Sequence, residues 1–486
     1  MFKIPDIDLV VSNLYPFSEV ISKEHDYNDA IENIDIGGVT LIRAAAKNHK
    51  CISVFTDPYD YYLIEKIFDE SSVKNIRKYL SKKAFEYVCL YDMKISEYFS
   101  EGKNIYRGYR TEMNLKYGAN PHQNALVMSQ IYPQIDFPFE ILNGSAGYIN
   151  YMDAVRAWDL VCEASCAMNG IEVAASFKHT TPSGVAINGP VDDVILEHLG
   201  MDDIKSGAAR ALTRARDSDP LSSFGDLVAV SHKVDLETAL VLKREFSDGI
   251  IAPDYDEDAL EVLSSKKSKK YLIIKATTNL FSKGTEIHEI SNGVTLKQQR
   301  NDYLFTYKDF QNTVTTNKDI HRSSIDDLLL ANITLKYTPS NSIAISVGGR
   351  VIGIGAGQQN RVDCVSLAGK KAISWALRRN EKTKSIKFKS ETKRQDKINT
   401  RTLFSQNNYS EIKDIIEGDI PEPITEQERQ ELLSKSYFCL ASDAFFPFRD
   451  SIDVAYKCGI KYIAQPGGSL ADNSVINACN EYNICM

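Results

Sequence analysis

The chain has 486 residues, enough for two or three domains that each bury a core of their own. Its 57 basic and 65 acidic residues give a formal net charge of −8, which excludes a global electrostatic footprint for nucleic acid and leaves only local phosphate sites. No apolar run approaches the length of a membrane span, and the N-terminal residues lack the features of a signal peptide. Nine scattered cysteines fit a reducing compartment, so we expect a cytosolic protein.

The first part of the chain alternates short apolar strands with helices. Strands are predicted at Leu9–Val11 and Ile52–Phe55, with a helix at Val39–Asn48 between them. A polar stretch from Gly108 to Glu112 then marks a change in composition. We therefore predict two α/β domains, one at residues 1–109 and one at residues 110–486.

A helix is predicted from Tyr151 to Met168, because apolar residues recur there at helical spacing until Asn169-Gly170 ends the pattern. Cys162 and Cys166 lie four residues apart in it, but zinc needs two further ligands that the neighbourhood does not supply. We interpret both cysteines as core-facing and expect no metal site. The basic runs at residues 266–270 and 378–397 are interpreted as solvated surface.

Lys178-His179 is the best candidate for chemistry. It stands where the apolar segment 173–177 runs into the turn Thr180-Thr181-Pro182-Ser183-Gly184. At the end of a strand, a histidine can remove a proton while a lysine stabilises negative charge. Neighbouring strand residues point to opposite faces, so the two share a site only if the strand ends there, which the turn favours. Taken alone, such a pair is more often an ordinary surface feature.

The glycine-rich stretch Gly353-Ile354-Gly355-Ala356-Gly357 raises the alternative of a dinucleotide site. Its spacing is Gly-x-Gly-x-Gly rather than Gly-x-Gly-x-x-Gly, and polar residues follow where an apolar helix start is expected. The motif therefore does not favour dinucleotide binding.

Several longer motifs accompany Lys178-His179 in a fixed order. They lie at residues 116–123, 222–226, 340–342, 353–361 and 442–450. Together they resemble the AICAR transformylase/IMP cyclohydrolase family, bifunctional enzymes of the last two steps of purine nucleotide synthesis, and the segments at 222–226 and 378–397 are similar to the animal and fungal form. The resemblance covers essentially the whole chain. It implies a truncated methylglyoxal-synthase-like α/β domain followed by a transformylase domain of two cytidine-deaminase-like halves. No duplication is visible in the sequence, and the deaminase zinc signature is absent.

The resemblance implies that 10-formyltetrahydrofolate donates a formyl group to the 5-amine of AICAR to give FAICAR. The folate acts as a co-substrate, and no tightly bound cofactor is expected. Because the amine is a poor nucleophile, a base must remove its proton, and we assign His179. Lys178 and Asn341 are assigned to the oxyanion that forms on attack.

Further roles follow from matched motif positions. The residues matched to AICAR binding are Lys116, Tyr117, Gly225, Asp248, Arg361 and Phe445. Those matched to folate binding, across a homodimer interface, are Val362, Asp450 and Ser469. Lys116 departs from the arginine of the family, which binds phosphate bidentately. In the cyclohydrolase domain the matches are Asn13 and Asp35 for the purine and Lys47 for catalysis.

The family's cyclohydrolase domain contains a phosphate-binding loop before the position that matches Met1. After the position that matches Met486, the family's transformylase domain continues through a short strand with an arginine that helps to hold the AICAR phosphate. We therefore expect a formyltransferase whose cyclohydrolase half, from FAICAR to IMP, is impaired. The alternative is a catalytically impaired relative that keeps the fold for nucleotide binding or dimerisation.

Overall fold

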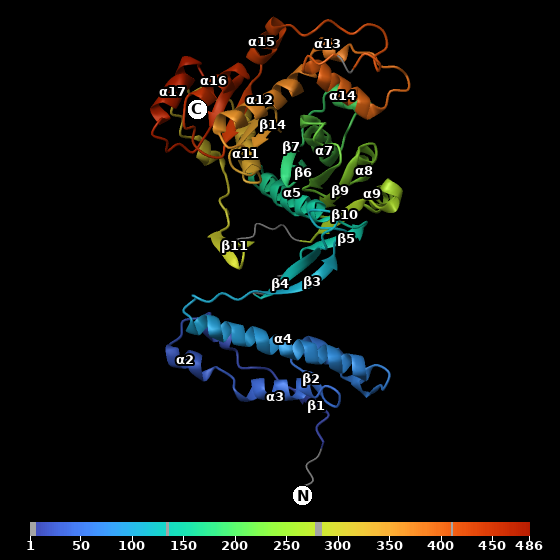
Figure 1. Cartoon of the computed structure of the whole chain (residues 1–486), viewed down its shortest axis with the longest axis vertical. Helices are drawn as coiled ribbons and strands as arrows, with labels where there is room; N and C mark the ends of the chain where they lie inside the picture. The colour runs from blue at the N-terminus through green and yellow to red at the C-terminus, as the bar shows by residue number, and fades with distance from the viewer. Residues whose placement is uncertain (1–5, 133–135, 278–283, 410–411) are drawn as a thin grey trace. The chain divides into compact units, whose positions relative to one another are not determined.

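The computed structural model describes residues 6–132, 136–277, 284–409 and 412–486. The chain forms two compact units (Figure 1). Unit 1 comprises Met1–Met113 and Val127–Phe137, and unit 2 comprises Asn114–Leu126 and Pro138–Met486. The boundary that we predicted at residue 110 falls inside a strand, β3 (Gly108–Asn114), which pairs with β4 (Leu126–Tyr132).

Unit 1 is a small α/β unit. Its parallel strands β1 (Leu9–Val11) and β2 (Ser53–Phe55) and its helix α3 (Gly37–Lys47) confirm the three elements predicted there. The remaining elements are α1 (Phe17–Ile21), α2 (Tyr27–Glu32), the 3₁₀ helices η1 (Pro58–Leu63) and η2 (Glu65–Phe68), and α4 (Val73–Phe99). Apolar side chains of α3, α4 and both strands form one core.

Unit 2 is organised around a sheet of ten strands in the order β16-β15-β13-β14-β7-β6-β8-β9-β10-β5. The strands of the first part are β5 (Phe139–Asn143), β6 (Val173–Lys178), β7 (Thr181–Ile187), β8 (Asp226–Val230), β9 (Ser247–Ala252) and β10 (Leu272–Ala276). Those of the second part are β13 (Ser342–Ser346), β14 (Arg350–Ala356), β15 (Phe438–Ser442) and β16 (Ile460–Ala464).

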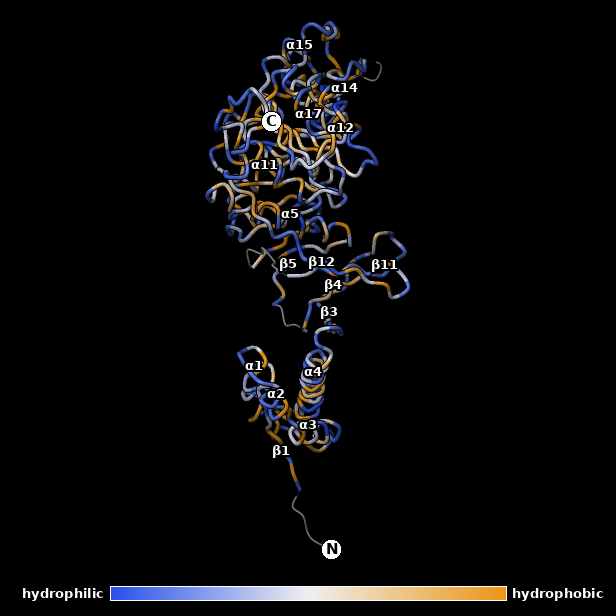
Figure 2. Tube along the Cα trace, turned by 90° about the vertical axis from the view of Figure 1, so that its left-hand side faces the viewer, coloured by the Kyte–Doolittle hydropathy of each residue, from blue (hydrophilic) through white to orange (hydrophobic). Residues whose placement is uncertain are grey.

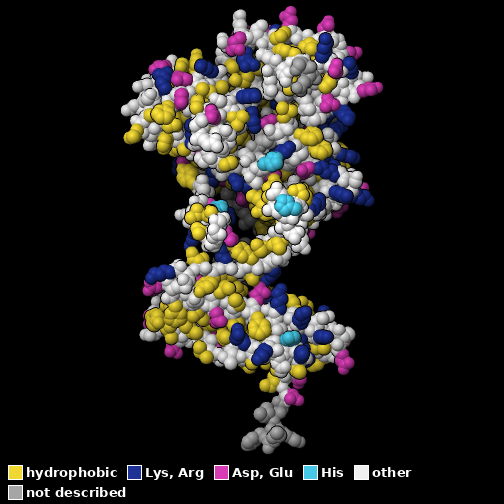
Figure 3. Space-filling view, viewed as in Figure 1, with side chains coloured by type: hydrophobic (Ala, Val, Ile, Leu, Met, Phe, Trp, Pro, Cys, Tyr) yellow, Lys and Arg dark blue, Asp and Glu magenta, His cyan; other side chains and the backbone are white. Residues whose placement is uncertain are grey.

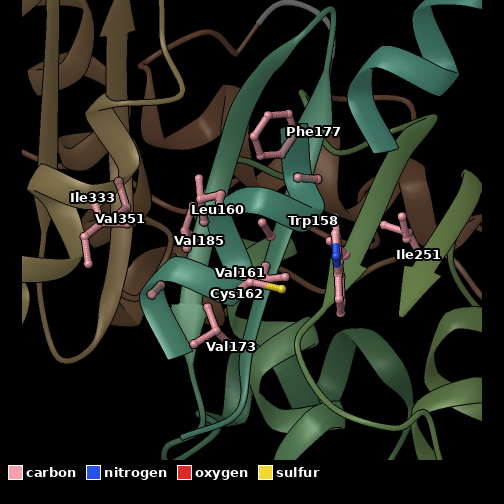
Figure 4. Close-up of a cluster of buried hydrophobic side chains, with 14 of the residues drawn as sticks. Trp158, Leu160, Val161, Cys162, Val173, Phe177, Val185, Ile251, Ile333 and Val351 are labelled. Atoms are coloured by element: carbon pink, nitrogen blue, oxygen red, sulfur yellow. The ribbon is translucent and has the colours of Figure 1, made fainter. Parts of the chain in front are cut away.

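Helices cover both faces of this sheet. One face packs against α5 (Tyr148–Ala167) and α11 (Arg322–Leu335). The other packs against α6 (Asp193–Leu199), α7 (Gly207–Ser218), α8 (Leu236–Lys243), α9 (Glu257–Ser264), α12 (Arg361–Leu377), α16 (Asp450–Lys457) and α17 (Asp472–Glu481). Burial on both faces explains why the strands are almost continuously apolar. Figure 4 shows the α5 side of this core, where Trp158 and Val161 lie near Phe177.

The remaining elements lie outside these layers. They are α10 (Lys266–Lys269), η3 (Tyr307–Phe310), α13 (Glu381–Lys384), α14 (Arg394–Ser405), α15 (Glu426–Ser434) and the hairpin β11 (Thr285–Ser291) and β12 (Val294–Gln299). The hairpin stands away from the body of unit 2 in Figures 1 and 2.

A repeated order of elements becomes visible only in the fold. Apart from the additional helices α6 in the first part and α13, α14 and α15 in the second, the series α5-β6-β7-α7-β8-α8-β9 returns as α11-β13-β14-α12-β15-α16-β16. In each copy an antiparallel hairpin is followed by two strands that pair in parallel, and the hairpins meet at the centre through β7 and β14. Unit 2 therefore contains two similarly built halves.

The glycine-rich stretch serves packing in this fold. A Cβ atom on Gly353 would lie 2.2 Å from the Ala368 carbonyl oxygen, and one on Gly355 would lie 2.2 Å from that of Cys364. Both carbonyls belong to α12. The glycines therefore let β14 and α12 approach closely.

Our predictions of side-chain exposure were wrong in part for the two basic runs and for the two cysteines of α5. Arg378, from the basic run at 378–397, is 1% exposed and bonds Asp217 at 2.7 Å, and Lys266 of the other run is partly buried. Cys166 is exposed, whereas Cys162 is buried as expected. On the face shown in Figure 3, basic and acidic side chains are interspersed in both units, as the charge balance implied.

Among the described residues, no helix is long and apolar enough to cross a membrane. No group of three or more candidate metal ligands occurs there either.

Candidate active site

All the site residues predicted between 116 and 486 lie along one margin of the ten-stranded sheet. The strands β6, β14, β15 and β16 end at this margin, whereas β8, β9 and β13 begin there. We call it the Lys178 margin and define it by the loops that join those strand ends. Residues far apart in sequence are thereby brought to one border of the sheet.

The strand β6 ends at Lys178, as the Lys178-His179 hypothesis required. His179 and Thr180 form the turn to β7 with φ angles of 53° and 64°. This is a two-residue hairpin whose central positions usually hold Asn-Gly or Gly-Gly. Left-handed backbone costs an ordinary residue about 1–2 kcal/mol, so the turn stores strain at His179 and Thr180.

The Lys178 side chain lies over the start of β8. Its Nζ donates to the Phe224 carbonyl oxygen at 2.6 Å, and a Cβ atom on Gly225 would lie 3.9 Å from it. The Phe224 ring stacks on Phe246 at 4.3 Å, and the Gly225 N–H donates to the Phe246 carbonyl. Lys178 and Gly225 therefore lie side by side at the Lys178 margin.

Asp248 follows on β9, and two neighbours that sequence reasoning missed contact it. Lys267 forms an ion pair with its carboxylate, and the Asn150 amide donates to it at 3.4 Å. Lys267 also lies 4.9 Å from the centre of the Phe246 ring and has a φ of 50°. An ammonium is thus held beside the carboxylate assigned to the ribose.

Tyr117 reaches the same margin through the start of α5. Its carbonyl accepts the Tyr148 N–H, and a Cβ atom on Gly147 would lie 2.6 Å from its ring. Lys116 precedes it with an exposed side chain, and its N–H donates to the Ala146 carbonyl. We name Tyr117, Lys178, His179, Gly225 and Asp248 the Lys178 group.

A buried ion-pair network supports this group from behind. Arg216 bonds Asp226 at 2.9 Å and Glu245 at 2.5 Å, and it donates to the carbonyls of Ser223 and Phe246. Burial raises the pKa of Asp226 despite Arg216, whereas for Glu245 burial is outweighed by Arg216 and Arg394, which lower its pKa. The network fixes the loop that carries Gly225.

A second group surrounds Arg361, whose side chain is 5% exposed. Its Nη2 donates to the Asn341 Oδ1 at 2.8 Å. Its Nη1 pairs with Asp443 and donates to the Ser442 Oγ at 3.1 Å and the Ser342 carbonyl at 3.2 Å. Arg361 therefore orients Asn341. The sequence showed both residues but not Asp443 as their anchor.

The folate-assigned residues and Phe445 lie beyond Arg361. Val362 follows it on α12, and Phe445 is 42% exposed in the loop after β15. Asp450 begins α16, and Ser469 lies in the loop after β16, where its Oγ accepts the Ala471 N–H. We name Asn341, Arg361, Val362 and Phe445 the Arg361 group.

The two groups are separate within one chain. Three strand spacings of about 4.8 Å lie between β6 and β13, so the strand ends that carry Lys178 and Asn341 are about 14 Å apart. The structure thus gathers the predicted residues on one margin, with His179 and Asn341 at the ends of strands that are not neighbours.

Unit 1 holds the residues matched to the cyclohydrolase. The buried Asp35 accepts the Gly38 N–H at 2.6 Å and the Tyr15 N–H at 3.3 Å, which brings it near the exposed Asn13. Lys47 is exposed in the last turn of α3. Lys47 lies nine positions after Gly38 along the helix, a rise of about 14 Å, so its backbone is distant from Asp35.

Comparison with known proteins agrees with this architecture. Residues 45–371 match the model of the AICARFT/IMPCHase bienzyme family. The chain is similar to the bifunctional purine biosynthesis protein PurH of Clostridium perfringens strain 13, at 34% identity over 500 residues that cover 100% of the chain and 80% of that protein. It is equally similar to the protein of that name in Persephonella marina, at 34% over 501 residues, covering 99% of the chain and 80% of the relative.

The chain belongs to the AICARFT/IMPCHase bienzyme family. Its activities are those that the family joins, AICAR formyltransferase and IMP cyclohydrolase, in purine biosynthesis.

Proposed function

We propose that the Lys178 margin is where the chain transfers a formyl group from 10-formyltetrahydrofolate to AICAR. The observation that carries this proposal is the gathering of the Lys178 and Arg361 groups on one border of the sheet from loops up to some 330 positions apart in sequence. Ligands of open α/β sheets bind beyond the carboxyl ends of strands, and β6, β14, β15 and β16 have their carboxyl ends at this margin.

His179 is proposed as the general base. It removes a proton from the 5-amine of AICAR as the amine nitrogen attacks the formyl carbon. The carbon–oxygen double bond opens to an oxyanion, which the Lys178 ammonium and the Asn341 amide stabilise. When the oxyanion collapses, the bond to N10 of the folate breaks, and N10 takes up the proton that His179 removed from the amine. Each residue thus acts on a stated atom of the substrates.

The nucleotide is proposed to lie on the Lys178 group. Asp248 is placed to accept hydrogen bonds from ribose hydroxyls, and Lys267 and Lys116 offer ammonium groups to the phosphate. Phe445 is half-exposed and free to stack on the base. The folate would contact Val362, Asp450 and Ser469. No tightly bound cofactor is proposed.

We propose further that the working enzyme is a homodimer whose sites are shared. The supporting observation is that β6 and β13, whose ends carry Lys178-His179 and Asn341, lie three strand spacings or about 14 Å apart in the sheet, so that one chain presents the two groups on separate strand ends. In a symmetric dimer the Lys178 group of one protomer can face the Arg361 group of its partner. Mixing His179→Ala with Asn341→Ala protein tests this arrangement, because shared sites predict partial recovery of activity from two inactive variants.

We also propose the fold family of each unit and the location of the protein in the cell. The two repeated halves of unit 2 support a transformylase domain of two cytidine-deaminase-like halves, and we propose that unit 1 is the methylglyoxal-synthase-like cyclohydrolase domain. There, Asn13 and Asp35 would hold the purine and Lys47 would act on it. We propose a cytosolic location.

The decisive experiment is a formyl-transfer assay with AICAR and 10-formyltetrahydrofolate. Wild-type protein is expected to turn over, and His179→Ala is expected to lose about 10²–10⁴-fold in kcat while AICAR binding changes less than tenfold. Near-wild-type turnover in His179→Ala would refute the assignment. AICAR binding without turnover by the wild type would instead favour a catalytically impaired nucleotide-binding relative.

A further inference from the structure

The turn that presents His179 has a backbone its residues do not favour. His179 and Thr180 both have positive φ angles, at 53° and 64°. Threonine is β-branched, and such residues are genuine outliers in the left-handed region. An outlier of this kind persists only where the surroundings over-determine it. A group outside the turn must therefore hold it.

Asp153 is that group. It lies on α5, twenty-six residues before His179, and is only 4% exposed. Its Oδ1 accepts the Thr180 N–H at 2.5 Å. Burial raises the pKa of Asp153 to about 6, and the amides of Thr180 and His179, the His179 ring and Arg156 oppose this rise. The carboxylate thus lies against the whole turn.

The second half of unit 2 also has a helical aspartate that accepts hydrogen bonds from a hairpin turn, but that turn carries no residue proposed to act in catalysis. Asp327 on α11 accepts the Gly348 N–H at 2.8 Å and the Gly349 N–H at 2.6 Å, at the turn between β13 and β14. The φ angles there are 59° and 74°, which glycine adopts without strain. The fold therefore uses an aspartate to cap both hairpins, and only the first turn carries ionisable and strained residues.

We propose that Asp153 is a positioning residue for formyl transfer, which holds the strained turn so that His179 stays on the Lys178 margin beside Lys178. This inference rests on the proposed role of His179. Without the carboxylate, the Thr180 N–H loses its acceptor and the turn relaxes toward ordinary backbone angles. The imidazole then moves relative to the amine that it must deprotonate. The nucleotide contacts of Tyr117 and Asp248 do not depend on the turn.

The test compares four variants in the formyl-transfer assay. Asp153→Ala is expected to lower kcat at least 30-fold with the KM for AICAR within threefold of wild type. Asp153→Asn keeps one acceptor oxygen and is expected to lose less. Adding Thr180→Gly to Asp153→Ala removes the strain at one turn residue and is expected to recover part of kcat. Asp327→Ala, the matched control, is expected to lower the melting temperature and leave kcat unchanged.

The outcomes separate this inference from the proposed function. Wild-type kcat in Asp153→Ala together with an inactive His179→Ala would overturn the positioning role alone. Equal losses of kcat in Asp153→Ala and Asp327→Ala would also overturn it, because general destabilisation then explains both. An active His179→Ala would overturn the proposed site itself. If Asp153→Ala does not fold, Asp153→Asn decides the question. A kcat equal to that of the wild type, with KM unchanged, then counts against the proposal, and a reduced kcat supports it.

Discussion

Replacing Arg361 with lysine is expected to damage catalysis although the positive charge remains. The guanidinium makes four contacts through its two terminal nitrogens, to Asn341, Asp443, Ser442 and the Ser342 carbonyl. A lysine ammonium has three donors on one nitrogen and lacks the planar fork, so it keeps the Asp443 ion pair but not the hydrogen bond that orients Asn341.

The size of the effect follows from that lost bond. A hydrogen bond from a charged group contributes about 1.5–3 kcal/mol, which corresponds to roughly 10–150-fold in rate. If Asn341 stabilises the oxyanion, the loss appears mainly in kcat, because the oxyanion forms only in the transition state. The KM for AICAR is expected to change little.

The assay is steady-state formyl transfer with each substrate varied in turn, with thermal unfolding measured beside it. An unchanged kcat in folded Arg361→Lys protein would show that Asn341 is held by other contacts or plays no part. A raised KM for AICAR with unchanged kcat would mean that Arg361 binds the nucleotide directly and equally in the ground and transition states.

Three further predictions concern other parts of the molecule. Lys116→Arg is expected to lower the KM for AICAR without changing that for the folate, because arginine binds phosphate bidentately, and an unchanged KM in the same assay would contradict this. Arg216→Met leaves Asp226 and Glu245 buried without this cation and is expected to destabilise unit 2 by about 3–5 kcal/mol near pH 8. In the wild type, the lowered pKa of Glu245 stabilises the folded state above the unfolded-state pKa of this group, and that stability is lost as pH falls. In the variant, both carboxylates protonate at higher pH. Thermal unfolding should therefore show a smaller difference in stability between variant and wild type near pH 5 than near pH 8. Given FAICAR, the chain is expected to form IMP slowly, because about 14 Å of helix separates Lys47 from the Asp35 end of α3; fast, Lys47-dependent IMP formation would contradict this.

The sequence identified the residues that lie near breaks in secondary structure. Lys178-His179 stood out because an apolar strand meets a turn there, and the structure ends β6 at Lys178. The spacing of the glycines of β14 did not favour a dinucleotide site, and their close packing against α12 was not foreseeable from the sequence. Such signals are local, within a few residues of the chemistry.

What the sequence did not show depends on contacts between distant segments. Asp443 lies 82 positions from Arg361, and Lys267 lies 19 from Asp248. Nothing in the neighbourhood of either partner marks the pairing, because an ion pair between distant segments is specified by the fold and not by adjacent residues. Arg378 illustrates the opposite error. It lies in a run of charged residues that predicted an exposed side chain, but the structure buries the Arg378 side chain against Asp217.

The duplication of unit 2 explains why one hairpin turn can carry chemistry. Both halves need a tight turn held by a helical aspartate, and the second half meets that need with Gly348 and Gly349 at little conformational cost. In the first half, His179 and Thr180 adopt the same left-handed backbone. The turn is therefore less stable than one made of glycines, but it carries side chains that can react. Because both halves have the aspartate cap, the cap has a structural role that does not depend on catalysis. The His179 imidazole occurs in the first half alone, and we propose a catalytic role for it. The two halves can therefore share a backbone while no repeat is visible in their sequences.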